Sequence, residues 1–125
     1  MRFMSLLRAD ESCFDGTPPA VFQAMGEFAR EGFTNGTLVE MGGLGPSSLG
    51  AIVSLVDGTI TAVDGPFTET KELIGGYAVI DVHSRQEAVE LGRRLLEIHR
   101  DNWPGWEGSC EIRQLFVDSG NPDGS

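Results

Sequence analysis

The order of strand-like and helix-like segments constrains the fold of this chain more than any other feature. Two amphipathic helical stretches each lie between runs rich in β-branched and aromatic residues, and a hairpin signal separates the two units. The chain therefore has the pattern strand–helix–strand, hairpin, strand–helix–strand. With 125 residues, it suits one domain built as a sheet with helices packed on it.

The first helical stretch is predicted over residues 18–31. Thr17 can cap it, Pro18 can occupy its first position, and Gly32 is a natural stop. Its apolar face consists of Val21, Phe22, Met25, Phe28 and Ala29.

The second helical stretch is predicted over residues 84–102. Ser84 and Glu87 form the capping-box pattern, in which each side chain bonds the other residue's backbone N–H. An apolar stripe follows at helical spacing, consisting of Ala88, Leu91, Leu95 and Ile98.

Strands are predicted at residues 2–9, 36–41, 50–56, 59–63, 74–82 and 109–117. The Asp57-Gly58 pair is a strong hairpin signal, because both turn positions favour positive φ. Gly75-Gly76 indicates a β-bulge or a close backbone approach. Residues 42–46 are expected to form a flexible loop.

If the hairpin is an insertion, this order is the split β-α-β arrangement called ferredoxin-like. We expect an α+β fold with an antiparallel sheet and both helices on one face. One domain should cover residues 1–117, with 118–125 as a flexible tail. The strands carry too many apolar residues for a solvated sheet face, which predicts a homodimer packed sheet against sheet.

The charge balance argues against nucleic acid as a partner. Nine basic and nineteen acidic residues give a net charge of −10, and the basic residues are scattered. No signal-peptide pattern or membrane-length apolar run is found, so a cytoplasmic location is expected. Cys13 and Cys110 form no Cys-x-x-Cys pair, and a disulfide between them stays open. No cofactor motif is found.

The segment DGPFTETKE, residues 64–72, concentrates the candidate site residues. Asp64 can act as a general acid or base if the neighbouring Pro66 and Phe67 desolvate it. Alternatively, Asp64 bonds nearby backbone N–H groups and fixes a turn. Both interpretations fit the sequence.

Charged residues follow in the same segment. Lys71, the only lysine, can act as a base or nucleophile, or it is a solvated residue between Glu69 and Glu72. Glu69 and Glu72 can join Asp64 as oxygen ligands, but no supporting His or Asp cluster stands nearby, so no metal site is predicted.

Aromatic residues near the second helix have less specific interpretations. His83 is expected at the surface, and the helix dipole alone accounts for His99 near the helix C-terminus. Trp103 and Trp106 are either an aromatic wall for a ligand or partner, or packing residues.

The DGPFTETKE segment resembles the signature of the DGPF-type members of the YCII-related family. The surrounding residues fit as well: LVEMGGLGPSS at 38–48, GGYAVIDV at 75–82, Glu87-Ala88, and CEIRQ at 110–114. The resemblance covers roughly residues 2–117. It implies a dimeric α/β-barrel and little about activity, since DGPF-type proteins are biochemically uncharacterised.

Two further implications follow from that resemblance. Many DGPF-type proteins are linked to extracytoplasmic-function sigma factors by gene neighbourhood. Other YCII-like proteins carry a His–Asp pair proposed as an active site, but the predicted first helix of this chain has no histidine.

Two functional hypotheses follow. The first is a homodimeric small-molecule-binding protein or cofactor-free enzyme, with Asp64 as acid or base and with Phe67, Glu69, Lys71 and Glu72 as ligand-binding residues. The second is a non-catalytic regulatory or interaction module associated with a sigma factor. A cavity of roughly 300 Å³ or more would favour the first hypothesis.

Overall fold

The computed structural model describes residues 1–10, 13, 16–67 and 72–116. In chain order, the elements are β1 (Arg2–Ala9), α1 (Pro19–Asn35), β2 (Leu38–Gly43), the short 3-10 helix η2 (Ser47–Leu49), β3 (Ala51–Val56), β4 (Thr59–Asp64), β5 (Leu73–Asp81), α2 (Arg85–Asn102) and β6 (Gly108–Gln114).

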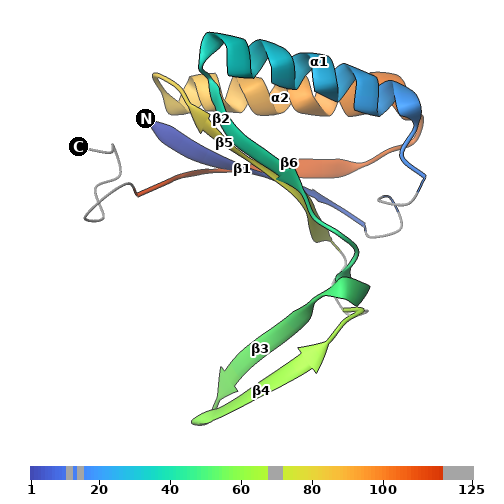
Figure 1. Ribbon diagram of the computed structural model, residues 1–125, viewed down its shortest axis with the longest axis vertical. Coiled ribbons are helices and arrows are strands. Elements are labelled where there is room, and N and C mark those ends of the chain that lie inside the picture. The colour runs from blue at the N-terminus through green and yellow to red at the C-terminus, as the bar shows by residue number, and fades with distance from the viewer. Residues whose placement is uncertain (11–12, 14–15, 68–71, 117–125) are drawn as a thin grey trace.

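Four strands form the central sheet in the order β2-β5-β1-β6, and every neighbouring pair is antiparallel. Both helices lie on one face of this sheet, and β3 and β4 form a separate two-stranded sheet (Figure 1). The expected α+β fold with antiparallel strands and two helices is confirmed. The strand order is compatible with a ferredoxin-like arrangement.

The core lies between the sheet and the helices. Its buried residues are Phe3, Ile80, Val82 and Ala88. Because side chains alternate along a strand, Phe3 and Ser5 face the helices, whereas Met4 and Leu6 face the other way. We call this second side of the four-stranded sheet the open face.

The expected β-bulge is confirmed at the glycine pair. Leu7 pairs with Gly76, but the next residue of β1, Arg8, pairs with Ile74, so Gly75 is the extra residue. A bulge of this kind bends its strand and increases the local twist.

Helix α1 is longer than predicted. It continues through Gly32 and ends at Gly36, whose φ of 84° provides the left-handed C-cap. Gly32 has a different role: a Cβ there would lie 2.9 Å from the Cβ of Leu38, so glycine allows the helix to approach β2.

The start of α1 also differs from the prediction. Thr17 does not cap the helix, because Pro18 is the N-cap and no side chain bonds there. Phe22, predicted on the apolar face, is 64% exposed.

Strand β2 also differs from the prediction. It starts at Leu38 and includes Gly42 and Gly43, which were expected in a flexible loop. Gly42 pairs with Tyr77, and a Cβ at Gly42 would lie 2.7 Å from the Tyr77 ring. The glycine therefore accommodates an aromatic side chain within a paired strand, a contact that local sequence does not reveal.

The predicted hairpin is confirmed. Asp57 and Gly58 both have positive φ, 51° and 77°, and the six residues of β3 pair with the six of β4. The hairpin projects away from the rest of the protein, on the side of the sheet opposite the helices (Figure 1). We call the segment Ala51–Asp64 the arm.

Several expectations concern the chain ends and the membrane. Strand β6 ends at Gln114, and the expected domain boundary and tail at 117–125 lie outside the described residues. Within the described ranges, no helix is long and apolar enough to cross a membrane.

The predicted cap of α2 is confirmed at Ser84, but the return bond of the capping box goes to a different residue. Ser84 Oγ accepts a hydrogen bond from Glu87 N at 3.1 Å, whereas Glu87 Oε2 accepts one from His83 N at 3.2 Å and not from Ser84 N. We expect Ser84→Ala to lower the free energy of unfolding by about 1 kcal/mol, because Glu87 N loses its acceptor. Ser84→Thr should retain most of that stability. Equal urea midpoints for wild type and Ser84→Ala would contradict the role of the cap.

Candidate functional site

A cavity of about 870 Å³ lies on the helix side of the sheet. Both helices, β1, β2 and β5 contribute to its walls. This volume falls within the range of small-molecule sites. Its apolar and aromatic lining includes Val21, Met25, Phe28, Leu91, Leu95, Trp103 and Trp106.

An ion pair joins the two helices at the cavity. Arg94 Nη2 of α2 lies 3.2 Å from Glu31 Oε2 of α1, and the Arg94 guanidinium carbon lies 4.7 Å from the centre of the Phe28 ring. All three residues line the cavity, and both charged ones are exposed, so this part of the lining borders solvent. An exposed pair of this kind contributes at most about 1 kcal/mol.

His99 is a buried polar residue of the lining. It is 3% exposed, and its Nδ1 lies 2.9 Å from the carbonyl oxygen of Leu95. Because a carbonyl only accepts, this contact assigns a proton to Nδ1. The His99 ring packs against Trp106 with centroids 4.5 Å apart, and Trp103 lies 6.4 Å from Trp106.

Sequence reasoning placed His99 only at a helix end and missed its burial. The signal was present, since His99 follows Leu95 by four residues and so continues the apolar stripe. The two tryptophans are both half-buried and line the cavity, and Trp106 also packs on His99, so the ligand wall and the packing role both stay predictions.

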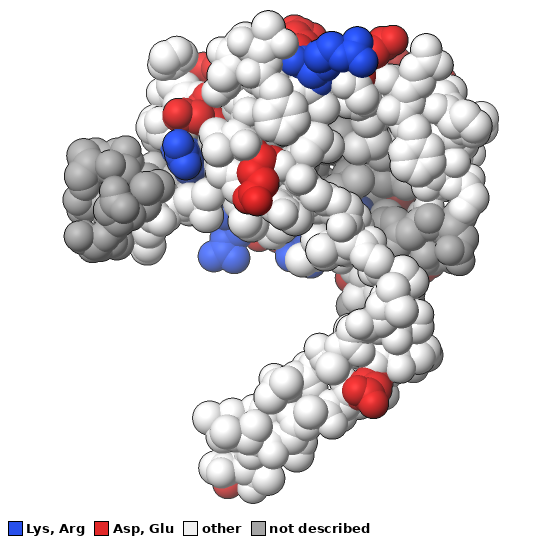
Figure 2. All heavy atoms as spheres, viewed as in Figure 1, with Lys and Arg blue, Asp and Glu red and all other residues white. Residues whose placement is uncertain are grey.

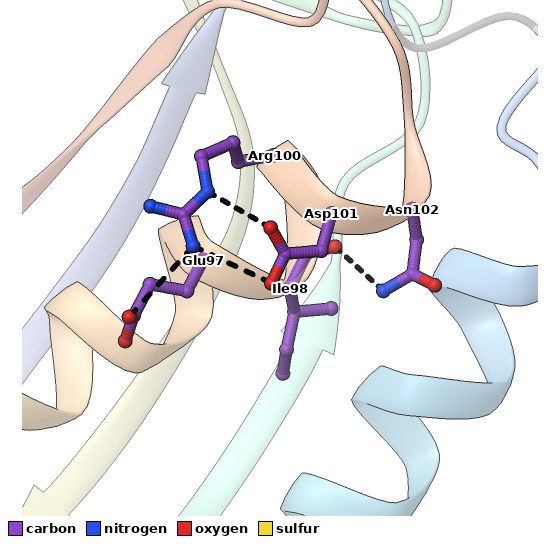
Figure 3. A network of polar contacts seen from close by, with 5 residues as sticks. All are labelled: Glu97, Ile98, Arg100, Asp101 and Asn102. Carbon is purple, nitrogen blue, oxygen red and sulfur yellow. Dashed lines mark hydrogen bonds and ion pairs between the residues drawn. The ribbon is translucent and has the colours of Figure 1, made fainter.

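The C-terminal end of α2 carries a network of polar contacts (Figure 3). Arg100 Nε donates to Asp101 Oδ1 at 2.8 Å, and Asn102 Nδ2 donates to the Ile98 carbonyl oxygen at 2.8 Å. The hydrogen bond from Arg100 lowers the pKa of Asp101, and the same bond raises the pKa of Arg100. Arg100 and Asp101 are exposed, Asn102 caps the Ile98 carbonyl in the last turn, and none of the three lines the cavity.

A thiol and a hydroxyl meet beneath α2. Ser5 Oγ lies 2.9 Å from Cys110 Sγ, and burial raises the pKa of the Cys110 thiol, partly offset by this hydrogen bond. The raised pKa keeps the thiolate scarce at neutral pH. Cys13 and Cys110 are both free cysteines, which settles the disulfide alternative for this structure.

The described residues of DGPFTETKE, 64–67 and 72, are not among those that line the cavity. Asp64 is the exposed last residue of β4, Phe67 is half-buried, and Glu72 is exposed. Glu69 and Lys71 lie outside the described residues. Across the described part of the chain, no three His, Cys, Asp or Glu side chains gather as metal ligands would.

The start of the motif packs against η2 instead. Gly65 N donates to the Gly50 carbonyl oxygen at 2.9 Å, and Phe67 N donates to Ser47 Oγ at 3.1 Å. The Phe67 ring lies beside Gly50, whose own Cβ would be 3.7 Å from it. These contacts fix the base of the arm. The role of Asp64 as a general acid or base stays a prediction.

Gly65 gives a direct test of this packing. Any side chain at Gly65 would collide with the Ser47 backbone carbonyl, which cannot turn aside as a flexible side chain would. We expect Gly65→Ala to destabilise the protein by about 3 kcal/mol, at the upper end for overpacking. Gly43→Ala is the matched control, because a Cβ there meets nothing within 4 Å. If thermal unfolding finds the two variants equally stable, the packing of the motif on η2 is wrong.

Comparison with known proteins identifies the family. The YCII-related domain model matches residues 1–100. An uncharacterized protein of Rhizobium meliloti (strain 1021) is 34% identical over 85 residues, a match that covers 63% of this chain and 64% of that protein's length. With most of β1 through α2 inside the matched range, the chain belongs to the YCII-related domain family.

Proposed function

We propose that this protein binds a small, largely apolar molecule in the cavity between the helices and the sheet. The observation that carries the proposal is the cavity itself, about 870 Å³ with a lining of aliphatic and aromatic side chains. Sites for small molecules combine such a lining with a few polar groups. Here His99 and the Glu31–Arg94 pair are polar groups of that kind.

The charge of the chain narrows the ligand class. A net charge of −10 disfavours polyanionic ligands such as nucleotides. Among the lining residues, His99 is buried and its Nδ1 already bonds the Leu95 carbonyl oxygen, so the lining suits a ligand with few polar groups. A neutral or weakly cationic aromatic or aliphatic molecule with one polar group fits both features.

A cofactor-free enzymatic activity based on Asp64 is a separate part of the proposal. Asp64 is exposed, so the described residues do not enclose its carboxylate. Such an activity would need a substrate held at the base of the arm, near Phe67 and Glu72. Asp64→Asn should abolish that activity and leave ligand binding in the cavity unchanged.

We also propose that the protein is a homodimer with the open faces in contact. Support comes from Met4, Leu6 and Val79, which alternation assigns to that face and which no helix covers. The alternative function, an interaction module with a sigma factor as partner, is favoured only by exposed apolar surface and not by any feature specific to a sigma factor.

Ligand binding can be tested with the protein's own fluorescence. Trp103 and Trp106 are the only tryptophans, and both line the cavity. We expect the neutral fluorophore N-phenyl-1-naphthylamine to quench them in a saturable manner. Ala29→Phe should weaken this binding at least about tenfold, because Ala29 lines the cavity and the added ring fills part of it.

Ala24→Phe is the matched control. Ala24 is also a half-buried alanine of α1 but does not line the cavity. Its affinity for the fluorophore should stay within about twofold of the wild type, a change below 0.5 kcal/mol. Absence of saturable quenching, or equal losses in both variants, would contradict a ligand site in this cavity.

A further inference from the structure

The arm carries six of the fourteen large apolar side chains that are exposed among the described residues: Ile52, Val53, Leu55, Val56, Ile60 and Val63. Of its twelve strand residues, only Ser54 is half-buried, and the others are exposed. Val53, Leu55 and Ile60 are 68%, 68% and 70% exposed. Strand register places these three residues on one face of the hairpin together with Ala62, because Val53 pairs with Ala62 and Leu55 with Ile60.

A two-stranded hairpin of this kind is marginally stable when it packs on nothing. The arm also has two unpaired strand edges, which are templates for association unless they are covered. Patches of exposed apolar residues on this scale mark an interaction surface. The arm therefore has the properties of an element that is buried in an assembly.

The total surface supports the same conclusion. The accessible surface of the chain is 8270 Å². A compact monomer of this mass is expected to expose about 6,500 Å². The excess of roughly 1,800 Å² is about twice the area that one partner buries in a standard protein–protein interface. A second copy would cover this area in an interface of the larger class that is typical of obligate homodimers.

The placement of the arm favours a second copy of this chain as its partner. The arm projects on the side of the sheet opposite the helices, which is the side of the open face (Figure 1). A second copy related by a twofold axis would bring an equivalent arm and an equivalent open face to that side. One symmetric contact would then cover both apolar surfaces of each chain.

The arm has few charged residues, as expected for a segment that packs against an apolar surface. Between Ala51 and Asp64, the only charged residues are Asp57 at the tip and Asp64 at the base. Figure 2 shows the arm almost entirely without charged side chains, in contrast to the body of the protein. A nucleic acid or a strongly charged protein would find no complementary groups there.

We propose that the β3–β4 arm is a docking arm, whose Val53–Leu55–Ile60 face packs against a second copy of the chain. This inference rests on the proposed homodimer and adds that the arm of each protomer packs against the other protomer. It assigns the hairpin insertion a role in assembly, separate from the ligand cavity.

Sedimentation velocity of the full chain over a range of concentrations tests this proposal. We expect the wild type to be a dimer at micromolar concentration. Val53→Thr combined with Ile60→Thr keeps β-branched residues in both strands but removes apolar surface. The dimer Kd should rise at least about 100-fold, because each substitution occurs twice in a symmetric interface.

The control is Phe33→Gln, which changes an exposed apolar residue of α1 on the helix side of the sheet and should leave the Kd within about threefold, or roughly 0.6 kcal/mol. Far-UV circular dichroism confirms that α1 and α2 remain folded in each variant. A dimer whose Kd is unchanged in the double variant would overturn the docking arm while leaving the homodimer intact. A wild type that is monomeric at every concentration would overturn both.

Discussion

The sheet of this protein has two faces, and the chain has helices for only one of them. Phe3, Ile80 and Val82 are buried beneath α1 and α2, but Met4, Leu6 and Val79 alternate to a face without a helix. The arm adds a second uncovered apolar surface on that same side. Burial of apolar surface is the main force that stabilises a domain of this size, and our proposals of a homodimer and a docking arm rest on this uncovered side.

The covered side is incompletely filled, and this gives the protein its candidate site. The fully buried large side chains in the described residues are Phe3 and Val21, whereas Met25 and Leu91 are only half-buried. Protein interiors are normally packed without large voids. A cavity of about 870 Å³ with His99 and two tryptophans in its lining is the basis of the ligand site that we propose.

The DGPF motif has a structural explanation that does not depend on catalysis. Gly65 is required because the Ser47 carbonyl occupies the space of its side chain, and the Phe67 amide and ring both pack on the η2 segment. The motif therefore anchors the base of the arm. If the arm is an assembly element, the motif determines the direction in which the arm leaves the sheet.

Local patterns predicted the elements of this fold well. The Asp57-Gly58 turn, the Ser84 cap of α2 and the bulge at Gly75 each depend on a few neighbouring residues, and each was found as expected. Contacts between distant residues were not predictable in this way.

Three cases show why. Gly32 contacts β2 and does not end α1; Gly42 accommodates Tyr77 from another strand; and His99 is buried because Trp106 folds against it. Each outcome is decided by a partner far away in sequence or across a turn. The projection of the arm and the cavity also depend on how whole elements are arranged, which strand and helix periodicity does not determine.

Hydrogen–deuterium exchange of the arm amides, measured at several protein concentrations, tests the central claim most directly. The claim is that the arm is stable only when a second copy covers it. Amides paired between β3 and β4 should be protected at high concentration and should lose protection on dilution, while amides of α2 stay protected throughout. Arm amides that exchange rapidly at every concentration, or that stay protected in a dilute monomer, would contradict the claim.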